Sequence, residues 1–249
     1  MIFAAGLGTR LAPFTLSHPK ALVEVGGIPM LQRTILRLKE AGITDIVINV
    51  HHFSKQIVDF LHQHNNCGVN IEISDENEGL LDTGGALVKA SDKFTGYDAV
   101  LVHNADILTD ANLANMVQSH KDSRSDVSLL VSNRKSSRYL YFNHDNRLVG
   151  WHNVKTGETL PENLQIDNQL KALAFGGIHI INTTVINELK QFSRVPAFSI
   201  IPFYVSKCDK LVIRGYQPSE HYIWHDIGTP EKLKEAEIEI TLQKKIYSK

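Results

Sequence analysis

A glycine-rich turn near the N-terminus, followed by two cationic residues, is the stretch of this sequence with the clearest chemical potential. Residues 3–11 read FAAGLGTRL, and the small residues of this run are Ala4, Ala5, Gly6 and Gly8. Backbone without bulky side chains can come close to a ligand, and its N–H groups can converge on anionic oxygens. Arg10 adds a planar cationic fork, and Lys20 adds a point charge. Together with Thr9, these residues favour a site that binds the phosphates of a nucleoside triphosphate.

This run differs from the two best-known glycine-rich phosphate loops. No Gly-Lys-Ser/Thr closes it, so it is not a Walker loop. Arg10 and Leu11 stand where a dinucleotide fingerprint needs its third glycine. A Gly-x-Gly alone could equally be an ordinary strand-to-helix turn. The added Thr-Arg-Leu-x-Pro and Pro19-Lys20 favour the anion-binding interpretation.

The elements that must position this turn alternate between strands and helices. Helices are expected over residues 30–41, 54–64, 110–121, 184–192, 199–207 and 230–246, with a short one within 79–87. Strands are expected over residues 45–50, 69–74, 99–103, 126–133, 174–181, 211–215 and 222–226. Ser54 and Asp110 are the expected N-caps of their helices. A hairpin (138–142 with 147–151) and a polar loop (153–171) interrupt the alternation. The pattern predicts a three-layer Rossmann-like α/β fold with a mixed, mainly parallel central sheet and a small hairpin and loop excursion.

Polar residues follow three of the expected strands. The glycine turn follows the first strand, the tripeptide Asn104-Ala105-Asp106 follows residues 99–103, and Asp226 ends the last short strand. Ligands of open α/β sheets bind outside the carboxyl ends of the strands, so the turn and the tripeptide are expected to face one crevice. The alternative for each acidic residue is a turn or helix-capping role.

Five motifs in order along the chain carry a resemblance to a known family. They are residues 3–31 (FAAGLGTRLAPFT to PKALVEVGGIPML), 81–85 (LDTGG), 104–106 (NAD), 175–178 (FGGI) and 224–230 (WHDIGTP). This set resembles the signature of the sugar-1-phosphate nucleotidylyltransferases, or NDP-sugar pyrophosphorylases, over nearly the whole chain. Its length and motif wording resemble compact bacterial members, such as the N-acetylmuramate-1-phosphate uridylyltransferases and mannose-1-phosphate guanylyltransferase-like proteins.

The resemblance implies that a sugar 1-phosphate oxygen attacks the α-phosphorus of an NTP, giving an NDP-sugar and pyrophosphate for cell-envelope glycans. This nucleophile is already an anion, so positioning and cationic clamps should carry the catalysis. The resemblance assigns Arg10 to the triphosphate and the departing pyrophosphate, and Lys20 to the α-phosphate or the sugar phosphate. It assigns Asp106 and Asp226 to Mg²⁺, a hard cation that one or two protein carboxylates can hold beside phosphates. Each cationic residue could instead be a solvated surface residue.

The base and sugar pockets are indicated less directly. The resemblance implies nucleotide contacts from Ala4, Ala5, Gly6, Gly8, Thr9, Arg10, Leu81, Thr83 and Gly84. It implies sugar or sugar-phosphate contacts from Lys20, Asn104 and Gly177. Thr83 is compatible with UTP and GTP users, so the base stays open between these two. Many relatives hold the sugar phosphate with the lysine of a Glu-Lys-Pro motif, which this sequence lacks, and Lys155 is a weak substitute.

Length and composition limit the domain organisation and the classes of partner that the protein can have. The 249 residues suffice for one core. We expect a single domain, with residues 1–133 mainly binding nucleotide and 134–249 mainly binding sugar, and no C-terminal β-helix. A net charge of -1 argues against a nucleic-acid partner. No apolar run approaches the ~20 residues of a membrane helix. Cys67 and Cys208 fit no metal-binding pattern and suit a reducing cytoplasm, and a homo-oligomer stays open.

Two other functions stay open at this point. One is CTP-dependent transfer to a phospho-alcohol, since such enzymes can look similar at the glycine turn. The other is a non-catalytic nucleotide-binding or regulatory subunit. The regulatory interpretation predicts loss of a metal carboxylate or a phosphate cation, whereas Arg10, Lys20, Asp106 and Asp226 are all present. The histidines, His51-His52 included, show no metal-ligand spacing.

Overall fold

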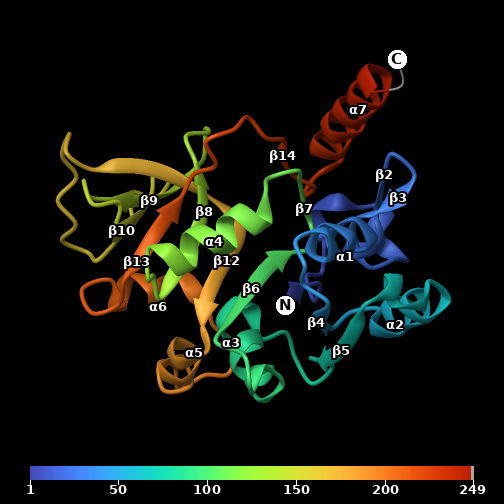
Figure 1. Cartoon of the computed structure of the whole chain (residues 1–249), viewed down its shortest axis with the longest axis horizontal. Helices are drawn as coiled ribbons and strands as arrows, with labels where there is room; N and C mark the ends of the chain where they lie inside the picture. The colour runs from blue at the N-terminus through green and yellow to red at the C-terminus, as the bar shows by residue number, and fades with distance from the viewer. Residues whose placement is uncertain (248–249) are drawn as a thin grey trace. The chain divides into compact units, whose positions relative to one another are not determined.

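A computed structural model describes the backbone of residues 1–247 and the side chains of residues 1–242. The chain has a mixed α/β fold (Figure 1). It divides into two compact units that interleave along the sequence. Unit 1 comprises residues 1–80, 103–113 and the segment from residue 220 onward. Unit 2 comprises residues 81–102 and 114–219. The expected assignment of nucleotide binding and sugar binding to the two sequence halves stays a prediction.

Unit 1 is built on short parallel strands. Its strands are β1 (Ile2–Phe3), β4 (Asp45–Val50), β5 (Asn70–Asp75) and the end of β6 (Ala99–Asn104), in the order β6-β1-β4-β5. Two small antiparallel pairs accompany them: β2 (Glu24–Val25) with β3 (Ile28–Pro29), and β7 (Ile107–Thr109) with β14 (Trp224–Asp226). Every residue of β4 after the first is buried, as expected for a strand covered on both faces.

The helices of unit 1 are α1 (Met30–Glu40), α2 (Ser54–Gln63) and α7 (Pro230–Tyr247), and α7 leads to the C-terminus (Figure 1). The expected apolar face of α1 is confirmed, because Leu31, Ile35 and Leu38 are fully buried. Gly42 follows the helix with a φ of 80°, a conformation that suits glycine after a helix end. No helix within residues 1–247 combines the length and the apolar character that a bilayer crossing needs.

Unit 2 contains a mostly antiparallel set of strands. They are the start of β6, then β8 (Val127–Ser132), β9 (Arg138–Phe142), β10 (Leu148–Asn153), β11 (Thr159–Leu160), β12 (Lys171–Asn182) and β13 (Ile213–Tyr216). Pairing follows the order β11-β10-β9-β12-β8-β13, and β8 with β13 is the parallel pair of this series. The mixed sheet is therefore confirmed, whereas the expectation of mainly parallel pairing holds for unit 1 and is wrong for unit 2.

The helices of unit 2 are α3 (Asp82–Lys89), α5 (Thr183–Leu189), α6 (Ile200–Lys207) and nearly all of α4 (Leu113–Asp122). Unit 2 also has a short 3₁₀ segment at Ser91–Phe94, and those of unit 1 are Thr9–Leu11, Phe14–Leu16, Lys20–Leu22 and Asn65–Gly68. The expected hairpin of β9 and β10 is confirmed. The polar loop after it contains β11, which pairs with β10 and which its composition did not indicate.

Both expected helix caps are wrong. Ser54 is the first residue of α2 rather than its cap, and its hydroxyl lies 3.4 Å from Oδ1 of Asn77. Helix α4 begins only at Leu113, and the Asp110 carboxylate instead accepts a hydrogen bond from the Ile223 N–H at 2.6 Å. A short polar side chain bonds whichever N–H group the fold brings near it, and the Ile223 donor is 113 residues away in sequence.

Candidate active site

The start of the glycine turn is hydrogen-bonded to a buried polar side chain, that of Asn49. The Ala4 N–H donates to Oδ1 of Asn49 at 2.8 Å, and Nδ2 of Asn49 donates to the buried carboxylate of Glu76 at 2.7 Å. Ala4 and Ala5 are themselves buried, whereas Gly6 is exposed. The Ala4 N–H is thus already used within the protein. A contribution of Ala4 to ligand binding would come from its small size.

Gly8 shapes the second half of the turn. Its φ of 66° lies in the left-handed region, and its carbonyl accepts hydrogen bonds from the Leu11 N–H and the Thr15 hydroxyl, each at 2.8 Å. A Cβ at this position would lie 2.9 Å from Cβ of Lys20 and 2.9 Å from Cγ2 of Thr15. Glycine is therefore required here both by the backbone conformation and by the close approach of the Lys20 stem.

Lys20 reaches the first of the two predicted acidic residues. Its Nζ forms an ion pair with Oδ2 of Asp106, 86 residues further along the chain. The Lys20 side chain is 12% exposed and the Asp106 side chain 28%, so the pair is partly shielded but open to a ligand. The Ala105 N–H donates to the Phe3 carbonyl at 3.0 Å, which fixes the segment before Asp106 beside β1.

Asp226 lies on the strand that pairs with the segment after Asp106. In the β7–β14 pair Asp226 is opposite Ile107, and the Ile227 N–H donates to the Asp106 carbonyl at 2.8 Å. Leu11, Leu108 and Ile227 belong to one buried apolar cluster, which holds the glycine turn, β7 and the end of β14 together. Unit 1 therefore brings the turn and both predicted acidic residues into one neighbourhood.

Two cationic side chains, Lys232 and Arg10, lie near the Asp226 carboxylate. Nζ of Lys232 lies 2.7 Å from Oδ2 of Asp226. A Cβ built on Gly228 would lie 2.7 Å from Oδ1 of Asp226 and 3.4 Å from Nη2 of Arg10, so both groups flank this glycine. The cluster thus combines three cationic side chains with two carboxylates. Its excess of positive charge suits a phosphate-rich ligand.

The donor set of this cluster also limits the metals that it could hold. Within the described residues, no three His, Cys, Asp or Glu side chains gather as a metal site. Two carboxylates suit Mg²⁺, which keeps several waters and takes further oxygens from phosphates. They do not match the three or four protein ligands of a typical zinc site.

Comparison with known proteins agrees with this chemistry. A model of the nucleotidyl transferase family matches residues 1–243. The chain belongs to the nucleotidyl transferase family. It is 30% identical over 237 residues to N-acetylmuramate alpha-1-phosphate uridylyltransferase of Neisseria meningitidis serogroup B, covering 95% of this chain and 96% of that protein. It is 28% identical to mannose-1-phosphate guanylyltransferase of Mycobacterium tuberculosis, over 93% of this chain and 61% of that protein.

Solved structures share the fold of this nucleotidyltransferase. HddC from Yersinia pseudotuberculosis, in complex with GMP-PN, superimposes with a TM-score of 0.72 at 22% identity and covers 96% of this chain and 97% of its own. A putative glucose-1-phosphate thymidylyltransferase from Bacillus anthracis, in complex with a sucrose, superimposes with a TM-score of 0.77 at 20% identity, covering 95% and 92%. These structures show the mixed α/β fold, and the family match shows that the chain is a nucleotidyltransferase enzyme, as the motifs indicated.

Three of the nucleotide-binding residues predicted from the family resemblance lie in unit 2, where they form hydrogen bonds with Phe198 and Ile200. The Gly84 N–H donates to the Phe198 carbonyl at 2.8 Å, and the Phe198 N–H donates to the Leu81 carbonyl at 3.1 Å. A Cβ on Gly84 would lie 2.3 Å from the Phe198 ring. Oγ1 of Thr83 accepts a hydrogen bond from the Ile200 N–H, at the start of α6, at 3.0 Å. Their contacts with a base stay predictions.

The remaining predicted sugar contacts lie on different units. Gly177, in unit 2, is buried and has a φ of 75°, at the point where the β12–β8 register shifts between Phe175 and His179. Lys155, also in unit 2, is exposed. Asn104, in unit 1, is half-buried at the end of β6. The sugar-binding roles of Gly177 and Asn104 stay predictions.

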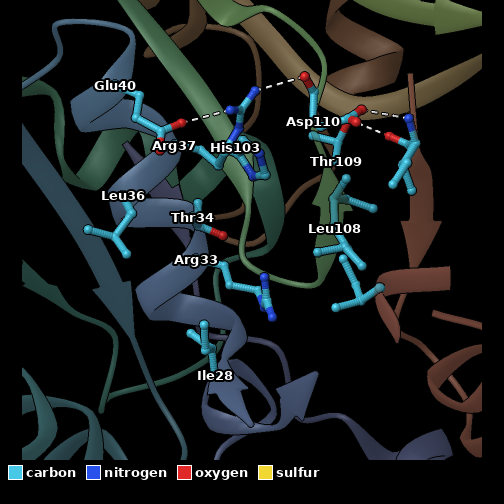
Figure 2. A pocket seen from close by; sticks show the side chains of 13 residues that line it. Ile28, Arg33, Thr34, Leu36, Arg37, Glu40, His103, Leu108, Thr109 and Asp110 are labelled. Carbon is cyan, nitrogen blue, oxygen red and sulfur yellow. Dashed lines mark hydrogen bonds and ion pairs between the residues drawn. The ribbon is translucent and has the colours of Figure 1, made fainter. Parts of the chain in front are cut away.

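A cavity of about 250 Å³ lies elsewhere in unit 1, against α1 and β7 (Figure 2). At one end of it, Arg37 donates to Glu40 at 2.7 Å and to the Asp110 carbonyl at 2.8 Å, and these bonds are drawn as dashed lines in Figure 2. His103 lines the cavity, and its Nδ1 donates to the Asn104 carbonyl at 2.8 Å. Burial lowers the pKa of His103 to about 4, so the ring is neutral near pH 7. None of the predicted site residues lines this cavity within the described part of the chain.

Sequence reasoning missed two residues of the site's surroundings. Lys232 follows Asp226 by six residues in the first turn of α7, a place where a cation is unfavourable beside the helix dipole unless an anion is near. Asn49 is a polar residue within an otherwise apolar strand segment, DIVINV. Both unusual positions were visible in the sequence, but the sequence did not show which residues Lys232 and Asn49 would contact.

Proposed function

We propose that the chain transfers a nucleotidyl group from UTP or GTP to a sugar 1-phosphate and releases pyrophosphate, with Mg²⁺ as cofactor. The observation that carries the proposal is the cluster in unit 1, where the glycine turn, Lys20 with Asp106 and Asp226 lie together. The family assignment and the uridylyltransferase and guanylyltransferase relatives support the same reaction.

The reaction needs charge neutralisation more than proton transfer. An oxygen of the sugar 1-phosphate forms a bond to the α-phosphorus of the NTP, while the bond from that phosphorus to the oxygen bridging the β-phosphorus breaks. The nucleophile is an anion, so no general base is required. Arg10 is exposed and can bind the triphosphate and the departing pyrophosphate. Lys20 is held by the turn and can bind the α-phosphate as charge builds there.

Asp106 and Asp226 are the residues that would hold Mg²⁺. They come from neighbouring strand ends, and their oxygens are the ligands this cation prefers. When bound, Mg²⁺ neutralises phosphate charge and orients the reacting groups. The lysine partner of each carboxylate balances its charge before the cation arrives.

The relatives support the proposed substrates, and the unit 2 residues predicted from the motifs are the proposed base contacts. Relatives named as uridylyltransferase and guanylyltransferase support UTP or GTP, with base contacts from Leu81, Thr83 and Gly84. Asn104 and Gly177 are the proposed sugar contacts. The product would be an activated sugar for cell-envelope glycans, made in the cytoplasm where nucleoside triphosphates occur.

Pyrophosphate release tests the proposal. The protein is incubated with Mg²⁺ and every pair from UTP, GTP, CTP and dTTP with a panel of sugar 1-phosphates, and with phospho-alcohols as a separate arm. We expect release with UTP or GTP and a sugar 1-phosphate, and its loss after chelation of Mg²⁺. No pyrophosphate release with any sugar 1-phosphate, with tight nucleotide binding retained, would support a regulatory subunit instead. Pyrophosphate release only with CTP and a phospho-alcohol would show that the acceptor is a phospho-alcohol and not a sugar 1-phosphate.

Asp106→Asn tests the metal role within the same assay. It should abolish turnover and leave the melting temperature close to that of the wild type, since a similar side chain is retained. Asp59→Asn is the matched control, because Asp59 also pairs with a lysine, Lys55 at 2.7 Å, on an exposed helix face. Full activity of Asp106→Asn would remove Asp106 from the metal site.

A further inference from the structure

Each of the two proposed metal carboxylates already has a lysine partner in unit 1. Lys20 pairs with Asp106, and Lys232 pairs with Asp226 at 2.7 Å. The two lysines differ in accessibility, because the Lys20 side chain is 12% exposed and the Lys232 side chain 43%. Lys232 can therefore turn to a new partner in solvent with less rearrangement.

The position of Lys232 makes an anionic partner necessary. It is the third residue of α7, so its ammonium lies near the positive end of the helix dipole. The Arg10 guanidinium also lies near Asp226, on the side of Gly228. Asp226 is the anion that balances this positive charge, and it can no longer do so fully once its oxygens bind a divalent cation.

We propose that Lys232 binds the phosphate of the sugar 1-phosphate, after its ammonium has exchanged Asp226 for that phosphate. This inference rests on the proposed function. The reacting oxygens approach and leave the α-phosphorus roughly in line, so a cation that holds the departing pyrophosphate is poorly placed to hold the acceptor phosphate as well. Arg10, next to the glycine turn, takes the first role, and Lys232, on a separate helix beside Asp226, takes the second.

The exchange predicts that Lys232→Met weakens binding of the sugar 1-phosphate and strengthens binding of the metal. The KM for the sugar 1-phosphate should rise about 10- to 100-fold, the loss expected for one hydrogen bond to a charged group. The KM for the NTP should stay within about threefold. In the absence of any nucleotide, the affinity for Mn²⁺ should increase about two- to fivefold, because a half-exposed ammonium no longer competes for Asp226.

The experiment combines steady-state kinetics with a direct metal titration. Free Mn²⁺ is counted by electron paramagnetic resonance, which needs no turnover. Lys232→Arg keeps the charge and should recover most of the sugar 1-phosphate affinity. Lys234→Met is the matched control, since Lys234 is an exposed lysine on the same helix. It should change neither the KM for the sugar 1-phosphate nor the Mn²⁺ affinity.

Each outcome decides the inference. A purely structural ion pair would lower the melting temperature of Lys232→Met and leave the KM for the sugar 1-phosphate and the Mn²⁺ affinity unchanged, which would overturn it. An increase in the KM for the NTP in place of the sugar 1-phosphate would assign Lys232 to the triphosphate and overturn it as well. Should the wild type release no pyrophosphate with any pair, the proposed function fails, and an unchanged Mn²⁺ affinity of Lys232→Met would separately refute the exchange.

Discussion

Gly8→Ala perturbs the point where the glycine turn contacts Lys20. The new β-carbon would occupy a left-handed conformation at a φ of 66°, which costs roughly 1–2 kcal/mol for a non-glycine residue. It would also lie 2.9 Å from carbons of both Lys20 and Thr15. Carbon atoms prefer separations of about 3.5–4.0 Å, so the neighbours must shift by about 0.6 Å or more.

The expected loss of stability combines these two effects. Overpacking of this kind costs about 1–3 kcal/mol, which with the backbone strain gives a loss of about 2–5 kcal/mol in the free energy of unfolding. Displacement of the Lys20 stem also moves its ammonium relative to Asp106. A misplacement approaching 1 Å at a catalytic group costs on the order of 100-fold, so kcat/KM should fall by about that factor.

Urea denaturation and pyrophosphate release measure the two effects separately. Gly6→Ala is the comparison, because a Cβ on Gly6 meets no atom within 4 Å. It should change the free energy of unfolding by no more than about 0.5 kcal/mol. Because Gly6 is predicted to contact the nucleotide, Gly6→Ala should nevertheless raise the KM for the NTP. Wild-type stability and kcat/KM in Gly8→Ala would refute the reasoning, because the turn would then tolerate a side chain against Lys20.

Two further predictions concern buried polar groups. Asn49→Ala leaves the Ala4 N–H and the Glu76 carboxylate without this buried partner, so urea denaturation should show a loss of about 3 kcal/mol. Asn70→Ala removes an exposed side-chain hydrogen bond to Asp45, and the free energy of unfolding should fall by less than about 1 kcal/mol. Equal losses for the two variants would contradict the anchoring role of Asn49. Burial lowers the pKa of His179 to about 3, so between pH 3 and 6.5 the unfolded chain binds a proton at this ring that the folded chain excludes. Stability from this group is complete above pH 6.5 and declines below it. Between pH 7.5 and 5 the wild type should therefore lose about 2 kcal/mol more than His179→Phe, and parallel curves would exclude His179 as the cause.

The local elements of unit 1 could be predicted from the sequence. β4 has the expected bounds, and α1 buries the expected face, because both depend on the periodicity of neighbouring apolar residues. The three-residue strand β7 was not predicted, whereas the similarly short β1 and β14 lie where strands were expected. The pairing of β7 depends on a distant partner, β14, and three residues are too few to show a period in the sequence.

The extent of parallel pairing could not be predicted either. The strands of unit 2 other than β11 were expected where the structure has them, but whether β12 pairs antiparallel with β8 and β9 depends on the path of the chain between them. The hydrogen-bond partners of polar side chains could not be predicted for the same reason, because they depend on which distant groups the fold brings near. Asp110 looked like a helix cap, and it bonds Ile223 instead.

The sequence by itself predicted the chemistry of the site, because the glycine turn, Arg10, Lys20 and the two acidic residues stand in motifs that favour phosphate and metal binding. Only the tertiary structure decided which of these groups meet. Lys20 reaches Asp106 across 86 residues, and Lys232 lies beside Asp226 in a unit where Ala236 of α7 packs in one core with Leu108 and Ile227. The physical reason is that burial of apolar surface, which is non-directional, selects the distant partners, and the charges then pair within the neighbourhood that packing creates.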